Sequence, residues 1–278
     1  MENYFDTQIA FGTAYVAISP DLQMWISDKA ALHRAIEVGY KVFDAAEMYG
    51  ITGRDGRSEK MLGEVLKESG KRDQLHIVSK VLPFNATDKK TIVSCCQNSI
   101  KRLQCDYIDT YMLHWRQPQN LELGHVVEAF HELQTAGLIK KFGVSNFDIE
   151  SMEEWKTFEE ELGADSFVTN QIHYSLATKT SERYLDWHRD NNITIMSYSP
   201  LNNNRNNILS NRNYLNIAQQ HGYEPAQLAL AWVMKRPEVI AITSSTNNKR
   251  IENNFLATQI KLTPEVISDL NKLFFRGI

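Results

Sequence analysis

The sequence predicts an α/β protein in which eight strand–helix units close into a (β/α)8 TIM barrel, a single domain over residues 1–278. Short apolar runs alternate with segments of helical periodicity almost to the end of the chain. A strand that is repeatedly followed by a helix requires parallel pairing with right-handed crossovers. An open doubly wound sheet is the alternative, but no G-x-G-x-x-G follows the first strand to favour it.

In the first half of the chain, residue types that begin or end helices delimit the segments. Ser58 and Asp88 are typical N-cap residues, and Gly70 is typical of a helix end. The predicted order is a helix around 31–38, a strand at 42–43, a helix at 58–70, a strand at 76–80, a helix at 88–103 and a strand at 107–113.

The second half repeats this alternation, and Pro237 marks the end of one of its helices. Residues 202–207 are all asparagine except Arg205 and lack apolar anchors, which predicts a surface loop. The predicted order is a helix at 126–133, a strand at 139–144, a helix from about 148, a strand at 167–169, a helix around 184–187, a strand at 193–198, a helix at 227–234, a strand at 239–242, a helix at 247–256 and a C-terminal helix that ends soon after residues 273–275.

Composition excludes several classes of protein. The net charge of −4 and the lack of a basic stripe argue against a nucleic-acid partner. Three cysteines, two of them adjacent, favour a reducing compartment over a disulfide framework, and no pair has metal-ligand spacing, so no metal is expected. No basic-then-apolar leader and no run of about 18 apolar residues is present, which predicts a cytoplasmic protein without a membrane partner.

Four ionisable residues lie at or just beyond three successive predicted strand ends. Asp44, Lys80 and His114 end or follow strands, and Tyr49 lies in the loop after Asp44, in D-A-A-E-M-Y-G. In a parallel barrel these ends form one rim. An ammonium group favours the phenolate, and a carboxylate can hold that ammonium in place. Singly, each residue is typical of a turn or a solvated surface; together they predict a general acid for carbonyl reduction.

The chain resembles the aldo-keto reductases from about Phe11 to its C-terminus. Within that family, W-R after His114 and S-K-V-L-P-F-N (79–85) resemble the bacterial reductases of methylglyoxal and similar small aldehydes. The motifs that carry the resemblance are G-Y-K-V-F-D-A-A-E-M-Y-G (39–50), R-S-E-K-M-L-G-E-V-L (57–66), S-K (79–80), L-H-W (113–115), G-V-S-N-F (143–147), N-Q (170–171), S-Y-S-P-L (197–201) and S-S-T-N-N-K-R-I-E-N-N (244–254).

For catalysis, the resemblance implies Tyr49 as the proton donor to the carbonyl oxygen and Lys80 as the group that lowers its pKa. Asp44 would orient Lys80, and His114 would hydrogen-bond the substrate oxygen. The chemistry agrees, because hydride attack on a carbonyl builds an alkoxide that needs a proton and electrostatic stabilisation.

The resemblance also implies NADPH as the cofactor, with NADH possible. Four of the residues that would bind this cofactor also have a purely structural explanation. Ser145 and Asn146 suit a helix N-cap, Tyr198 suits core packing, and Arg250 suits a solvated helix face. Ser244 stands where many members carry a lysine for the extra phosphate of NADPH. The resemblance implies that Ser145, Asn146 and Gln171 bind the nicotinamide amide and that Tyr198 stacks on the nicotinamide ring. Ser199 to Leu201 would contact the pyrophosphate. The 2′-phosphate or the adenine would be bound at the start of the helix predicted at 247–256, by Ser245, Thr246, Arg250 and Asn254.

Five residues near strand exits are candidate substrate contacts, suited to a compact, partly apolar carbonyl compound: Tyr15, Met48, Phe84, Trp115 and His173. Each is equally typical of packing. About ten residues precede F-G-T-A-Y (11–15), so the N-terminal hairpin usual in the family is expected to be shortened or absent.

Two other functions remain open at this point. A reductase-like barrel can act as a cofactor-sensing partner or regulatory subunit, and the same four residues would not exclude it. A metal-dependent barrel hydrolase is disfavoured because no strand end shows H-x-H or a comparable ligand pattern. The physiological substrate and the oligomeric state are not determined by these patterns.

Overall fold

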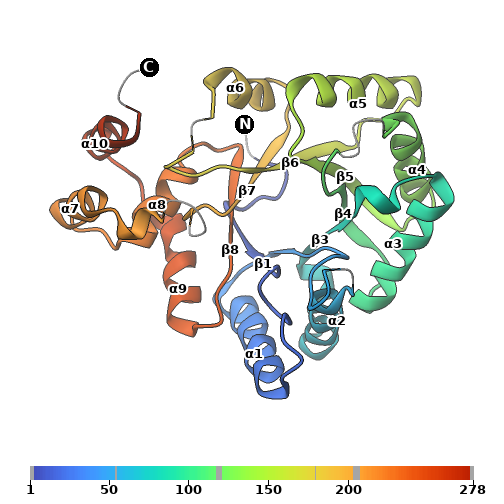
Figure 1. The fold of residues 1–278 in the computed structure, drawn as a ribbon, viewed down its shortest axis with the longest axis horizontal. Coiled ribbons are helices and arrows are strands. Elements are labelled where there is room, and N and C mark those ends of the chain that lie inside the picture. Colours follow the sequence, from blue (N-terminus) through green and yellow to red (C-terminus); the bar gives the residue numbers. More distant parts are fainter. Residues whose placement is uncertain (1–2, 54, 117–120, 179, 203–206, 276–278) are drawn as a thin grey trace.

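Eight parallel strands form a closed barrel, with the helices arranged around its outside (Figure 1). Each strand pairs with the next one along the chain, and β8 pairs with β1. This computed structural model describes residues 3–53, 55–116, 121–178, 180–202 and 207–275. The predicted (β/α)8 barrel is confirmed. The strands are β1 (Ile9–Gly12), β2 (Val42–Asp44), β3 (His76–Val81), β4 (Ile108–Leu113), β5 (Ile139–Ser145), β6 (Phe167–His173), β7 (Thr194–Tyr198) and β8 (Val239–Thr243).

The helices agree with the predicted order and add one that was not predicted. Asp88 caps α3 as expected, accepting from the backbone N–H of Thr91. Ser58 does not cap α2, because Gly56 holds that position and Ser58 is buried. The helices are α1 (Leu22–Val38), α2 (Arg57–Ser69), α3 (Lys89–Leu103), α4 (Leu123–Thr135), α5 (Ile149–Glu161), α6 (Glu182–Asp190), α7 (Arg212–Gln220), α8 (Pro225–Val233), α9 (Asn248–Leu256) and α10 (Pro264–Phe274).

Helix α7 was missed because it is short and largely polar. It has only nine residues, of which Tyr214 and Ala218 alone are buried, too few for a clear helical pattern in the sequence. Asn211 supplies its N-terminal signal, accepting from the backbone N–H of Tyr214. The predicted surface loop at 202–207 lies mostly outside the described residues. No helix in the described ranges has the length and apolar character that crossing a bilayer requires.

Two apolar layers form the core. The larger lies between the outer faces of the strands and the surrounding helices, and the smaller fills the barrel itself. Because side chains alternate along a strand, one set points outward to the helices and the other points inward. The inner cluster consists of Phe5, Ala10, Val42, Val78, Met112, Met196, Ile240 and Ile242.

The N-terminal segment closes the lower end of the barrel without a hairpin. Residues 3–8 contain no strand, yet Phe5 belongs to the inner cluster and packs edge-on against the His76 ring at 4.8 Å. The backbone N–H of Tyr4 donates to Thr194 Oγ1 at 2.9 Å, and Gln8 Nε2 donates to the carbonyl of Met234 at 2.8 Å. Among the described residues, the buried phenyl ring of Phe5 therefore covers the lower end of the barrel.

Replacing the Phe5 ring should destabilise the barrel, because the ring fills its lower end. Phe5→Ala should lower the free energy of unfolding by about 3–5 kcal/mol, because truncating a buried phenyl group leaves a cavity. Denaturant unfolding would measure the loss. Phe84→Ala is the control, since the Phe84 side chain is exposed and should cost less than about 1 kcal/mol. Equal losses in the two variants would contradict the assignment of Phe5 to the floor.

Candidate active site

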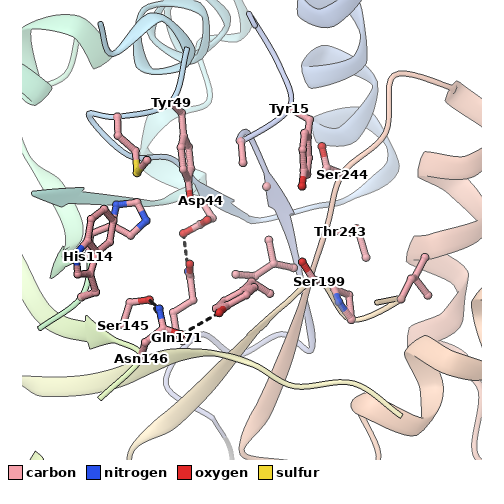
Figure 2. Close-up of a pocket in the computed structure, with 18 of the residues that line it drawn as sticks. Tyr15, Asp44, Tyr49, His114, Ser145, Asn146, Gln171, Ser199, Thr243 and Ser244 are labelled. Atoms are coloured by element: carbon pink, nitrogen blue, oxygen red, sulfur yellow. Dashed lines mark hydrogen bonds between the residues drawn. The ribbon is translucent and has the colours of Figure 1, made fainter. Parts of the chain in front are cut away.

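A cavity of about 700 Å³ opens at the carboxyl ends of the strands (Figure 2). Figure 2 shows Tyr49 and His114 on one side and Ser199, Thr243 and Ser244 on the other. Its walls come from β1, β2 and β5 to β8, from loops that follow the strands, and from α9. The lining residues are Gly12, Ala14, Tyr15, Asp44, Met48, Tyr49, His114, Trp115, Ser145, Asn146, Gln171, Tyr198, Ser199, Pro200, Leu201, Ile242, Thr243, Ser244 and Asn254.

A buried ion pair lies beneath the cavity. Lys80 Nζ is 2.7 Å from Asp44 Oδ1 and donates also to the Ala45 carbonyl at 2.8 Å. Lys80 is fully buried and Asp44 is 3% exposed. Burial lowers the pKa of Lys80, and the Asp44 carboxylate opposes that shift. Lys80 Nζ lies 3.4 Å from the Tyr49 hydroxyl, so three of the four predicted residues are in contact.

The pKa of Tyr49 is raised well above 10, chiefly by burial and then by the Asp44 carboxylate. The sequence had implied Lys80 as the group that lowers this pKa, and the upward direction corrects the expectation of a lowered pKa. The reason is that burial disfavours the phenolate directly and the negative charge of Asp44 disfavours it further. The phenol is therefore protonated at neutral pH, which is the state that a proton donor requires.

His114 completes the predicted group of four. Its ring lies edge-on to Tyr49, with 5.7 Å between the ring centroids, and 4.8 Å from the Trp115 ring. Burial, followed by the positive charge of Lys80, holds the pKa of His114 well below its usual range, so the imidazole is neutral. Nδ1 is buried with no hydrogen-bond partner among the described residues.

A cluster of amide and hydroxyl groups lies across the floor. Ser145 Oγ donates to the Gln171 carbonyl at 2.9 Å, and Asn146 Nδ2 donates to Ser145 Oγ at 3.0 Å. The Tyr198 hydroxyl donates to Asn146 Oδ1 at 2.9 Å. Asp148 caps α5, accepting from the N–H of Ser151, so the alternative that Ser145 and Asn146 cap this helix is wrong.

Gln171 joins this cluster to the ion pair. Its Nε2 donates to Asp44 Oδ1 at 2.8 Å, the same oxygen that accepts from Lys80. Because a carboxylate only accepts hydrogen bonds, this contact fixes the orientation of the amide. Figure 2 shows the Asp44–Gln171 bond crossing the floor of the site.

Sequence reasoning missed several wall residues. Gly12 is needed because a Cβ there would lie 2.7 Å from Ile242 Cγ2. Ala14, Ile242 and Thr243 line the cavity but are chemically unremarkable types that carry no sequence signal. The signal for Gly12 was present in F-G-T-A-Y, the first segment of the match.

The segment predicted to bind the 2′-phosphate or the adenine differs from expectation in its position relative to α9. Ser245 and Thr246 precede α9 and do not belong to it, because Asn247 is its N-cap and accepts from the N–H of Arg250. Asn254 and Ser244 line the cavity, whereas Ser245, Thr246 and Arg250 do not. Arg250 lies in the first turn of α9 and is exposed.

Two predicted substrate contacts are not on the wall. Phe84 is 57% exposed and packs edge-on against Trp115, with 6.3 Å between centroids. The ring of His173 stacks on Tyr198 at 5.5 Å. Both rings pack against residues of the wall and are not among those that line the cavity, so the prediction that they line it is corrected. Tyr15, Met48 and Trp115 line the cavity as predicted. Within the described ranges, no group of three His, Cys, Asp or Glu residues is placed to hold a metal ion.

Comparison with known proteins gives one family. The model of the aldo/keto reductase family matches residues 8–274. The chain is 34% identical over 268 residues to methylglyoxal reductase YeaE of Escherichia coli K12, covering 95% of this chain and 89% of that protein. Methylglyoxal reductase DkgB of Salmonella typhimurium is 31% identical over 258 residues, covering 92% and 89%.

Solved structures agree in fold. An aldo/keto reductase from Klebsiella pneumoniae in complex with NADP and acetate has a TM-score of 0.86 and 34% identity, covering 96% of this chain and 91% of that chain. An aldo-keto reductase from the same organism in complex with NADPH has the same TM-score and identity, covering 96% and 90%.

Replacing one partner of the Asp44–Lys80 ion pair should lower the free energy of unfolding more than replacing both. Asp44→Asn should lower the free energy of unfolding by about 3–5 kcal/mol, because it leaves the Lys80 ammonium buried and unpaired. Adding Lys80→Met should recover part of that loss, since the buried charge is then gone. Urea unfolding of both variants would measure this. A double variant less stable than Asp44→Asn would contradict the coupling.

Proposed function

This chain belongs to the aldo/keto reductase family, and we propose that it reduces a small aldehyde or ketone to the corresponding alcohol with NADPH as the reductant. The observation that carries the proposal is the contact of Lys80 with Tyr49 and Asp44 at the wall of a cavity that His114 also lines. A neutral phenol, a buried ammonium and a neutral imidazole at one point suit a substrate oxygen that gains charge during reaction.

The cavity offers suitable groups for a nicotinamide ring. Ser145, Asn146 and Gln171 present the hydroxyl and amide groups that a carboxamide would bind, and Tyr198 offers an aromatic face. Ser199 has a φ of 49°, a strained value in a segment suited to lie against the pyrophosphate. The reduced cofactor would supply the hydride that adds to the carbonyl carbon.

The protein's own groups would manage the proton and the charge. As negative charge develops on the substrate oxygen, the Tyr49 hydroxyl donates its proton to that oxygen. The positive charge of Lys80, 3.4 Å away, stabilises the phenolate left behind. His114, being neutral, donates one hydrogen bond from a ring nitrogen and fixes the carbonyl. The alcohol then leaves, and the phenol regains a proton from solvent.

The wall favours a compact substrate. Tyr15, Met48 and Trp115 give the entrance an apolar, aromatic character, and the cavity volume of about 700 Å³ must accommodate both substrate and nicotinamide. The relatives named methylglyoxal reductases support a small aldehyde of that kind.

NADPH is preferred over NADH because solved relatives hold NADP or NADPH and because Arg250 is an exposed cation at the first turn of α9. An arginine there suits a 2′-phosphate. Ser244, which lines the cavity, adds a hydroxyl in place of the lysine found in many members.

Tyr49→Phe should reduce turnover of methylglyoxal by at least about 100-fold, because the proton donor is lost while the ring is kept. Binding of NADPH, followed by quenching of tryptophan fluorescence, should stay within about twofold of wild type. Tyr15→Phe is the matched control and should lose less than about tenfold. Near-normal turnover by Tyr49→Phe would remove Tyr49 from the mechanism. If the wild type shows no steady NADPH consumption across a panel of aldehydes, the regulatory alternative would be favoured.

Titration with both cofactors should give NADPH a dissociation constant at least about tenfold below that of NADH, the effect of one charge-assisted contact to the extra phosphate. Arg250→Ala should weaken NADPH and leave NADH unchanged. Tighter binding of NADH by the wild type would overturn the preference.

A further inference from the structure

Glu47 is a buried carboxylate in the loop that carries Tyr49, and the proposed chemistry does not use it. Its side chain is 7% exposed. It lies three residues after Asp44 and two before Tyr49. Burial raises its pKa, which shows that the protein meets a cost to keep this carboxyl group inside. A buried carboxyl group placed beside the proposed proton donor calls for an explanation.

Its hydrogen bonds tie the Tyr49 loop to the next strand end. Glu47 Oε1 accepts from the backbone N–H of Leu82 at 2.6 Å and from Asn85 Nδ2 at 2.9 Å. Burial, together with the Glu47 carboxylate, raises the pKa of the Cys95 thiol on α3. Donors from the β3 exit and from the turn after it therefore converge on one side chain.

The rest of the loop has few other side-chain anchors among the described residues. Its backbone is held by Ala45, whose N–H donates to Val78, and by Glu47, whose N–H donates to the Lys80 carbonyl at 3.2 Å. Tyr49 itself has a backbone bond to Ala46 within the same turn, and its carbonyl accepts from Ser58. Glu47 is thus the side chain that fixes the turn just before Tyr49 against the strand that bears Lys80.

We propose that Glu47 is a positioning residue that holds the Tyr49 hydroxyl at its distance from Lys80 and from the substrate oxygen. The inference rests on the proposed role of Tyr49 as proton donor. Without Glu47, the turn at 45–49 loses its attachment to Leu82 and Asn85, and the phenol moves relative to Lys80. Because proton donation depends on near-contact geometry, a small displacement lowers the rate of the chemical step more than it lowers cofactor binding.

The test compares Glu47→Ala with Glu47→Gln. Glu47→Ala should lower kcat for methylglyoxal about 10- to 100-fold, with the dissociation constant of NADPH within about twofold of wild type. The deuterium isotope effect on kcat, measured with deuterated NADPH, should rise because chemistry becomes slower than product release. Glu47→Gln should keep kcat within about threefold, since its amide oxygen can accept from the same Leu82 and Asn85 donors.

Glu159→Ala is the matched control. Glu159 is also a buried glutamate whose Oε1 accepts two hydrogen bonds, from the backbone N–H groups of Ser166 and Phe167, but these lie before and at the start of β6, at the opposite end of the barrel. This variant should lose stability yet keep the wild-type kcat at a temperature where it is folded. If Glu47→Ala does not fold, Asn85→Ala removes one of the Glu47 donors and should lower kcat at least about threefold with the same unchanged NADPH affinity.

A wild-type kcat in Glu47→Ala, equal losses in Glu47→Ala and Glu159→Ala, or an equal loss in Glu47→Gln would overturn the inference. Glu47→Ala should cause no further loss of kcat in a Tyr49→Phe background, because the residue acts through Tyr49. A further loss there would overturn the inference alone. Full turnover by Tyr49→Phe by itself would overturn the proposed function, and the inference with it, so the two failures are distinguishable.

Discussion

The buried ion pair between Asp44 and Lys80 constrains the active end of the barrel. Neither charge is stable in this interior without the other, so β2 and β3 must bring them within hydrogen-bond distance. Gln171 on β6 donates to the same Asp44 oxygen from across the barrel. A polar contact that requires three strands, one of them distant in sequence, exists only when the barrel is closed.

That constraint also sets the protonation states around it. Lys80 gains a counter-charge from Asp44, whereas burial disfavours the charged forms of Tyr49 and His114, so both are neutral when no ligand is bound. Tyr49 and His114, the groups that would face a substrate, are therefore uncharged before the reaction. Charge develops only when a carbonyl is reduced, and the ammonium group of Lys80 is already in place to stabilise it.

The sequence predicted the barrel and the four central residues because their signals are local. Apolar runs identify strands, and polar residues immediately after them must lie on the rim if the strands are parallel. Ser58 was misassigned because a serine before an apolar run is typical of a cap, whereas here its hydroxyl accepts from Thr13 inside the structure. Phe5 packs with Ile240, more than 200 residues away, and no local pattern shows it. Gly12 stands in F-G-T-A-Y, but the reason it must be small is Ile242 on the last strand. The direction of the Tyr49 pKa depends on burial, which a sequence does not quantify.

The short floor segment has a consequence for how the chain reaches its native state. The side chain of Asn3 donates to the Pro237 carbonyl, Tyr4 bonds Thr194, and β1 pairs with β8. These three contacts therefore cannot form until most of this sequence has been synthesised, although β1 can pair with β2 earlier. Joining such distant segments carries a loop-closure entropy cost before any contact compensates for it. The seam between β1 and β8, with the floor below it, is thus expected to be the late step of folding, and the edge of β1 that does not pair with β2 stays unpaired until then.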